Sequence, residues 1–148
     1  LRMSFYIILF LFITAVLFFT VFSPWYYGKE ARVMASKTNY AQTVRYISRE
    51  LGKCRLDDKS IMDNTLMCSD MNSKSLILAF LNKHETYNNP YYYPDDINAF
   101  RSSDSNTNDD DVGYVSLSAS GSNIIIKTCI KTPCRKEENR LQDSMELE

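Results

Sequence analysis

The sequence of 148 residues has little of the chemistry that enzymes use. It contains one histidine, His84, and no glycine-rich loop of the kind that cradles phosphate groups. No nucleophile and base occur at a spacing that suggests catalysis. These absences favour a non-enzymatic protein that needs no cofactor and no small-molecule substrate. His84 itself is expected at the C-terminal end of a short helix.

Charge is absent from Met3 to Tyr27. As a helix, this segment would be roughly 37 Å long, which exceeds the ~30 Å hydrocarbon layer of a bilayer. It lacks the small-residue cleavage site of a secretory signal, and it ends in Trp25-Tyr26-Tyr27, residues typical of a membrane–water boundary. The segment is therefore predicted to be a transmembrane helix that the protein retains.

The residues before this segment suggest an orientation. Arg2 is the only charged residue there, and basic residues favour the cytoplasmic side of a membrane. The chain begins with Leu1 rather than Met, which favours processing on that side. The expected location is the inner membrane first and, after assembly, the cell surface or an extracellular filament.

All four cysteines follow the apolar segment, and their even number favours disulfides in an oxidising compartment. Zinc is the alternative, but the spacings are not C-x-x-C and His84 is remote from them in sequence. Of the three possible pairings, we favour Cys54 with Cys68 and Cys129 with Cys134, because neighbouring cysteines close loops at the lowest entropic cost.

Apolar residues continue with helical spacing beyond the uncharged segment, at Tyr40, Val44, Ile47 and Leu51. Gly52 follows, where a left-handed residue often ends a helix. The pattern predicts one helix of about 50 residues that ends at Gly52.

Pro24 lies near the middle of this predicted helix. Proline removes one backbone hydrogen bond and clashes with the preceding turn. The helix is therefore predicted to be bent or unwound within the turn before Pro24.

The remaining chain has the pattern of a short helix followed by strands. Asn72 or Ser73 is expected to cap a helix with the apolar residues Leu76, Ile77, Phe80 and Leu81. Residues 101–111 are predicted to form a polar surface loop, residues 112–130 a β-hairpin with its turn at 120–123, and residues 141–147 a third strand. The predicted class is α+β, with a long N-terminal α-helix packed on a small antiparallel β-sheet.

Charge is unevenly distributed between two segments. Residues 29–55 contain seven basic and two acidic residues, whereas residues 56–111 contain four basic and eleven acidic ones. A solvated helix face beside an acidic loop is the simplest interpretation, but the asymmetry also suits subunits that pack against their own copies. The candidate intersubunit charges are Arg45 and Arg49 opposite Asp109, Asp110 and Asp111.

Two weaker patterns concern ligands. Asp104, Asn106 and Asn108 have the first spacings of a calcium loop, but the glycine at the sixth position and the glutamate at the twelfth are missing, which favours a solvated acidic loop without metal. Residues 91–93, three tyrosines, would suit adhesion or the stacking of nucleic-acid bases, although packing over the sheet is the favoured interpretation.

The order of these features resembles the type IV pilin family. The likeness rests on an apolar span with a proline, then aromatic residues followed by Ala31-Arg32-Val33, an amphipathic half-helix, an antiparallel sheet and a short C-terminal cysteine loop. The resemblance is to a divergent member. Residues 4–7 include no acid where most pilins carry a glutamate, and the usual glycine in mid-span is missing.

The resemblance implies a structural subunit of a type IV pilus-like surface filament. Residues 1–28 would then be a transmembrane and filament-core helix, and residues 29–148 an extracytoplasmic globular domain that includes the amphipathic half-helix. The residues expected to pack the filament core are Phe5, Ile8, Phe12, Phe19, Phe22 and Pro24.

The partners that the resemblance implies are copies of the chain in a helical homopolymer, the membrane before assembly, and pilus assembly machinery. A pseudopilin of a secretion machine and a single-pass, membrane-anchored periplasmic binding domain remain as alternatives. Adhesion, motility, DNA uptake and secretion all stay open as the use of the filament. Nucleic acid is a possible partner that no motif indicates.

Overall fold

The structure is a computed structural model that describes residues 2–84, 87–92, 95 and 97–147. Within the first helix, the side chains of residues 2–9, 15 and 18–27 are outside this description. The chain divides into two compact units, Leu1–Ala31 and Arg32–Glu148.

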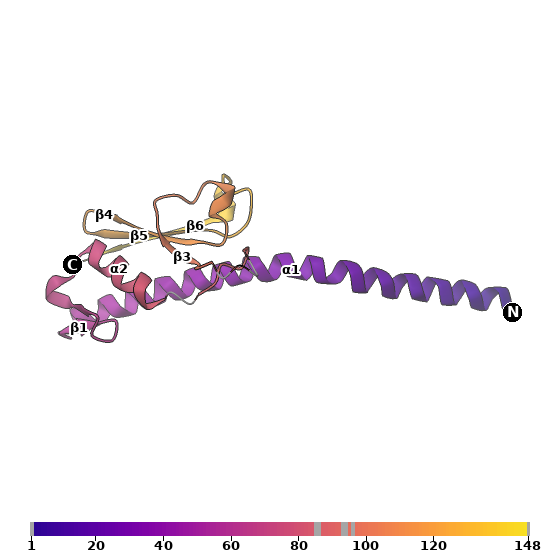
Figure 1. Ribbon diagram of the computed structural model, residues 1–148, viewed down its shortest axis with the longest axis horizontal. Coiled ribbons are helices and arrows are strands. Elements are labelled where there is room, and N and C mark those ends of the chain that lie inside the picture. Colours follow the sequence, from indigo (N-terminus) through magenta and orange to yellow (C-terminus); the bar gives the residue numbers. More distant parts are fainter. Residues whose placement is uncertain (1, 85–86, 93–94, 96, 148) are drawn as a thin grey trace. The chain divides into compact units, whose positions relative to one another are not determined.

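The first helix, α1, runs from Arg2 to Arg55 without interruption (Figure 1). Of the predicted bend or unwinding before Pro24, the unwinding is absent, because the backbone is α-helical through that turn, and the bend stays a prediction. A proline removes one hydrogen bond of the helix, and the bonds of the turns on either side remain. The end predicted at Gly52 is wrong. The Leu56 N–H donates to the Gly52 carbonyl at 3.2 Å, and the left-handed residue that follows the helix is Asp57, with φ of 66°.

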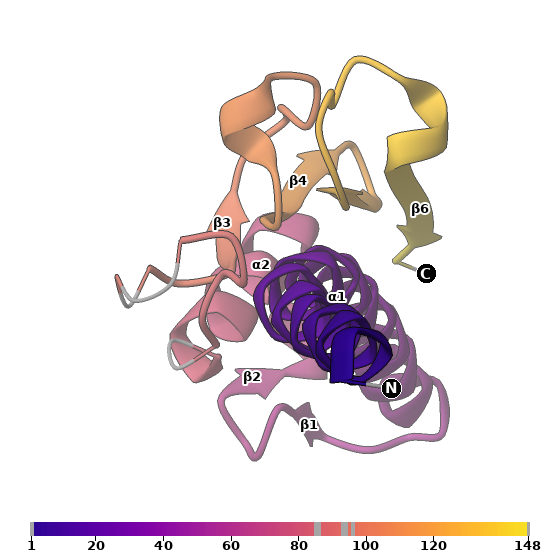
Figure 2. The same ribbon diagram turned by 90° about the vertical axis from the view of Figure 1, so that its right-hand side faces the viewer.

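Within Arg32–Glu148, α1 contributes one buried stripe to the core. Tyr40, Ile47 and Leu51 are buried there, and Val44 packs against the same cluster. This stripe was predicted from the spacing of four, three and four residues. Figure 2 shows α1 end-on, with α2 and the strands arranged around it.

The second helix, α2, spans Ser73–Lys83 and begins with a capping box. The side chain of Asn72 accepts a hydrogen bond from the Ser75 N–H at 2.9 Å, and the Ser75 hydroxyl accepts one from the Asn72 N–H at 2.9 Å. Leu76, Ile77 and Phe80 are buried in the same core as the α1 stripe. The short helix predicted here is confirmed, with Asn72 as its cap.

A four-stranded sheet in the order β3-β4-β5-β6 completes the core. Its strands are β3 Phe100–Ser102, β4 Val115–Ser120, β5 Asn123–Cys129 and β6 Arg140–Glu146. The predicted hairpin is confirmed as β4 and β5, and the predicted third strand is β6. The expectation of a purely antiparallel sheet is wrong, because β3 pairs with β4 in parallel.

The polar run of residues 101–111 is more ordered than predicted. Arg101 and Ser102 belong to β3, where they pair with Ser116 and Leu117, and residues Asp109–Asp111 form a 3₁₀ turn. A strand of three residues leaves no periodic pattern in the sequence, because only pairing with β4 defines it. Two more 3₁₀ turns lie at Cys68–Asp70 and Glu137–Asn139.

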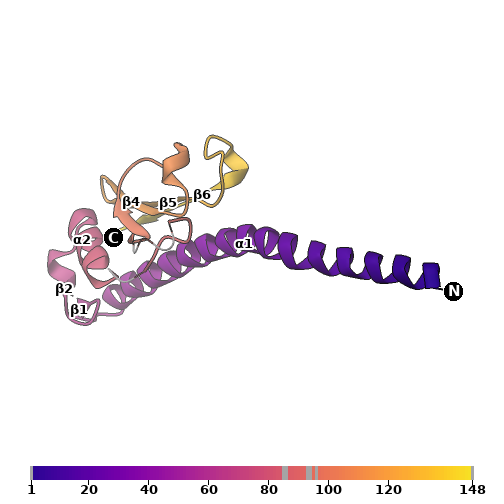
Figure 3. The same cartoon turned by 45° about the vertical axis from the view of Figure 1, so that its right-hand side comes forward.

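The segment between α1 and α2 contains a small two-stranded sheet of β1 Ser60–Ile61 and β2 Leu66–Met67. Figure 3 shows it beside the C-terminal end of α1. Both predicted disulfides are confirmed. Cys54 bonds Cys68, which ties α1 to the end of this segment, and Cys129 bonds Cys134 after β5.

The predicted membrane location is not supported. Among the residues that the structure describes, no helix is long and apolar enough to cross a membrane. The expectation of an inner-membrane stage is therefore wrong, and the two disulfides are compatible with an extracellular location.

Two glycines with positive φ allow a matched test of the packing behind the sheet. A Cβ atom at Gly113, where φ is 79°, would collide with the buried Asn89 side chain and lie 2.8 Å from Cδ2 of Tyr91. A Cβ atom at Gly121, where φ is 62°, meets nothing within 4 Å. Both changes to alanine carry a similar backbone cost of about 1 kcal/mol. Gly113→Ala should lower the free energy of unfolding by about 1 to 3 kcal/mol more than Gly121→Ala, measured by urea denaturation. Equal losses would show that Asn89 moves aside without cost.

Candidate functional site

The first candidate site is the apolar surface of α1 in the unit Leu1–Ala31. The described large apolar side chains there are exposed, with Phe10 and Phe12 each at 67%. Leu11, Ile13, Val16 and Leu17 are also exposed. Consecutive positions 10–13 point to different sides of a helix, so this surface is apolar around most of its circumference.

Of the six residues predicted to pack a filament core, Phe12 lies on this surface. The side chains of Phe5, Ile8, Phe19, Phe22 and Pro24 lie outside the described residues. The aromatic residues 25–27, predicted to mark a membrane boundary, lie outside them as well.

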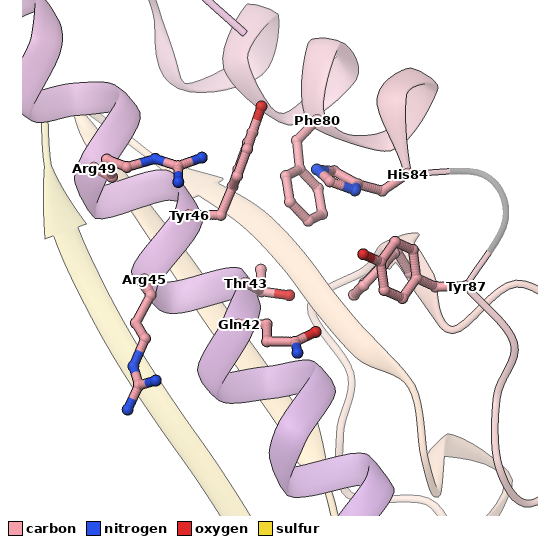
Figure 4. Close-up of a pocket in the computed structure, with 9 residues that line it drawn as sticks. Gln42, Thr43, Arg45, Tyr46, Arg49, Phe80, His84 and Tyr87 are labelled. Carbon is pink, nitrogen blue, oxygen red and sulfur yellow. The ribbon is translucent and has the colours of Figure 1, made fainter.

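The second candidate site is a cavity of about 330 Å³ in the unit Arg32–Glu148 (Figure 4). Five rings line it, and we call this set the aromatic pocket: Tyr46 from α1, Phe80 from α2, His84 directly after α2, Tyr87, and Phe100 from β3. Its remaining lining comes from α1, through Gln42, Thr43, Arg45 and Arg49. A volume of about 300 Å³ is at the lower end of the range for ligand sites in proteins, so the pocket suits a small apolar group.

His84 lies at the centre of the ring contacts. Its imidazole is 4.5 Å from the Phe80 ring, 4.8 Å from the Tyr46 ring and 5.5 Å from the Tyr87 ring, measured between centroids. Burial, and then the nearby Lys83 ammonium, lower the pKa of His84. The imidazole is therefore neutral at neutral pH and adds a flat, weakly polar wall rather than a charge.

The charged groups beside the aromatic pocket are basic. Arg49 is exposed, lies 3.4 Å from Glu50 and stacks 5.2 Å from the centre of the Tyr46 ring. Lys83 pairs with Asp63, and Arg45 is exposed on α1. In Figure 4, Arg45 and Arg49 extend from α1 on the side away from Tyr87. A ligand for this pocket would therefore meet apolar walls with positive charge to one side.

Glu50 is the buried acid of this region, and its charge is matched within the chain. It accepts hydrogen bonds from Lys53 Nζ at 2.8 Å and from the Met62 N–H at 2.7 Å. Burial would raise the pKa of Glu50, but these bonds and the charges of Lys53 and Arg49 lower it. Glu50 thus attaches the β1–β2 segment to α1.

The acidic loop before β4 is organised around Asp111. This carboxylate is 5% exposed, pairs with Arg101, and accepts hydrogen bonds from the Ser105 hydroxyl at 2.6 Å and the Asn108 N–H at 2.9 Å. Asp109 accepts a bond from the Cys134 N–H at 2.7 Å, whereas Asp110 is exposed. The carboxylates of Asp109 and Asp111 thus have partners in their own chain, and the predicted intersubunit role of this group remains a prediction.

The predicted calcium pattern lies in the same loop. Asp104 is exposed, Asn106 is buried, and Asn108 precedes the 3₁₀ turn, where its backbone carbonyl accepts a hydrogen bond from the Asp111 N–H at 2.9 Å. Two protein cations bind the loop: Lys127 donates to the Asp104 carbonyl at 3.2 Å, and Arg101 pairs with Asp111. Within the described residues, no group of three or more His, Cys, Asp or Glu side chains could hold a metal ion. Calcium binding by this pattern stays a prediction, because asparagine is not one of these four residue types.

The predicted tyrosine patch is divided by the structure. Tyr91 packs against the small cluster of Val112, Cys129 and Cys134, and the Tyr92 ring lies 5.7 Å from that of Tyr114. Tyr93 lies outside the described residues. The favoured interpretation, packing beside the sheet, is confirmed for Tyr91.

Comparisons of the chain with protein-family models, with curated proteins and with solved structures found no match. The two sites therefore have to be interpreted from their own geometry. The aromatic pocket was not anticipated from the sequence. Its rings come from α1, α2 and the segment before β4, and no periodic signal connects these positions.

The Arg101–Asp111 pair generates a pH-dependent prediction. Burial would raise the pKa of Asp111, but hydrogen bonds from Ser105 and Arg101 lower it overall. A lowered folded-state pKa stabilises the fold at pH values above the unfolded value of about 3.9, and this contribution is lost as the pH falls through the folded value. Asp111→Asn should lower the free energy of unfolding at pH 7 by about 2 to 3 kcal/mol.

The matched control is Asp110→Asn, which changes the exposed neighbour. Urea denaturation between about pH 2 and pH 7 should give an acid-side loss of stability that is shallower in Asp111→Asn than in the parent. If the two variants have the same stability at pH 7, the buried pair does not hold this loop.

Proposed function

We propose that this protein is the structural subunit of a type IV pilus-like filament, which assembles by packing the N-terminal part of α1 against copies of itself. The observation that carries the proposal is the exposed apolar surface of α1 at residues 10–13, 16 and 17. Burying one such side chain contributes about 1.5 to 3 kcal/mol, so covering the whole surface is strongly favourable. A parallel array of identical helices offers each copy a surface of the same kind.

The globular unit has a complete apolar core without this surface, and this supports the proposal. Its core consists of side chains from residues 40–126, with others from the last strand packed against it. The apolar residues of the N-terminal part of α1 are therefore not needed to fill that core. An exposed apolar surface of this kind is typical of a site that packs against another surface.

The two disulfides fit a subunit that works in an oxidising environment. A pseudopilin assembly would use the same helix packing. Pilus-type assembly machinery is the partner expected in either case. We propose no catalytic activity.

The proposal is tested by replacing Phe12 with Asp in the full chain. A charge at a packed helix surface should raise the concentration needed for assembly at least tenfold, because the buried phenyl ring is lost and a carboxylate is desolvated. Filaments are counted by negative-stain electron microscopy, and the polymer fraction is measured by sedimentation.

The control is Leu78→Asp, which places the same charge at an apolar side chain of α2 that is 60% exposed. This variant should assemble like the parent, and circular dichroism should show both variants folded. A parent protein that stays monomeric at every concentration tested, or a Phe12→Asp variant that assembles normally, would contradict the proposal.

A further inference from the structure

An apolar side chain projects from the end of α1. Leu56 is 81% exposed, the largest exposed fraction among the described large hydrophobic residues of the chain. Asp57 and Asp58 follow it and are exposed too. We call these three residues the acidic projection. The segment from Leu56 to Asp70 carries four acidic residues and one basic residue, and the basic residues Lys53 and Arg55 precede it on α1.

The aromatic pocket has the complementary properties. Its walls are rings, its volume of about 330 Å³ admits an aliphatic side chain, and Arg45 and Arg49 are the charged residues that line it. None of the described residues in its lining is acidic. The pocket is open enough for a side chain to enter, since Tyr87 at its edge is 40% exposed.

The projection cannot fill the pocket of its own chain. Leu56 follows Tyr46 by ten positions, and a helix rises 1.5 Å per residue, so the two are separated by about 15 Å along α1. Leu56 is also held at the helix end, where its N–H donates to the Gly52 and Lys53 carbonyls at 3.2 and 3.0 Å. Contact between the projection and a pocket therefore requires two molecules.

We propose that the acidic projection of one copy binds the aromatic pocket of another copy, with Leu56 among the rings and Asp57 and Asp58 facing Arg45 and Arg49. The inference deepens the proposed self-assembly and rests on it. The two surfaces differ, so after one contact forms the pair of molecules retains one free pocket and one free projection. Contacts of this heterologous kind extend into open chains when the rotation between neighbours does not close a ring.

The same geometry favours Asp57 and Asp58 over the acidic loop as the partner of the two arginines. Asp109 and Asp111 accept hydrogen bonds within their own chain, and Asp111 is buried. Moving these carboxylates to a neighbouring molecule would break those bonds. Asp57 and Asp58 are exposed beside an apolar side chain that matches the pocket.

The test uses the full chain with Phe12→Asp in every sample, so that packing of the N-terminal helix is weakened and the second contact is measured by itself. Leu56→Ser removes the projecting side chain. Gln42→Trp fills the pocket from an exposed position of α1. The matched controls are Leu78→Ser, at another exposed leucine, and Ser48→Trp, at an exposed position of α1 outside the pocket lining.

Sedimentation equilibrium should show concentration-dependent association of the Phe12→Asp protein that either site variant weakens roughly tenfold or more. The two controls should leave it unchanged. A mixture of the Leu56→Ser and Gln42→Trp proteins should form dimers and nothing larger, because each partner then supplies one intact surface.

A separate arm tests the charges. Arg45→Glu should weaken association at low salt, and adding Asp58→Arg should restore part of it, with both effects smaller at high salt. Normal association of both Leu56→Ser and Gln42→Trp would overturn the inference. A loss with Gln42→Trp alone would also overturn it, since the pocket would then hold another occupant.

These outcomes are distinguishable from failure of the proposed function. If the Phe12→Asp protein still forms filaments, the role of the N-terminal surface is wrong. The effects of Leu56→Ser and Gln42→Trp on those filaments then show, independently of the N-terminal surface, whether the projection binds the pocket.

Discussion

The globular unit depends on the burial of one face of α1 between Tyr40 and Leu51. This face supplies Tyr40, Ile47 and Leu51 to the core that α2 and the sheet complete. A helix that buries one face must expose the opposite one, so Arg45 and Arg49 are exposed on the same turns. The positive surface of the protein and its apolar core are thus two sides of the same helical segment.

The buried face also carries a polar residue that organises the segment after α1. Glu50 is almost fully buried, and its carboxylate accepts hydrogen bonds from the Met62 N–H at 2.7 Å and from the Lys53 ammonium at 2.8 Å. The Cys54–Cys68 bond attaches the same segment a turn further along. Leu56 directly follows the end of α1, after Cys54 and before Met62, so it lies within the loops that both attachments close. Its exposure therefore belongs to a well-connected part of the chain.

Local signals in the sequence were sufficient for several elements. Asn72 or Ser73 was predicted as the cap of α2, and it is Asn72, whose side chain satisfies a free N–H of the first turn through a bond made within four residues. The β4–β5 hairpin follows from alternation on either side of a turn that contains Gly121. The two disulfides join sequence neighbours, for which the entropy of loop closure was a valid guide.

Two of the errors in the sequence interpretation have a common origin. Gly52 resembled a helix end, yet the helix continues to Arg55, where Cys54 is bonded to Cys68. Residues 101–111 resembled a featureless loop, yet pairing with β4 forms β3, and Arg101 reaches Asp111 ten positions away. In each case a partner distant in the chain decided the local conformation.

The sequence by itself determined the long helix, the stripe that it buries, the cap of α2 and the hairpin, because each depends on contacts within a few residues or on a regular period. Only the tertiary structure decided the parallel pairing of β3, the burial of Asp111 and the aromatic pocket. The pocket combines Tyr46, His84 and Tyr87, which no period relates. Contacts of this kind form when separate elements pack together, so the order of residues along the chain does not encode them in a local pattern.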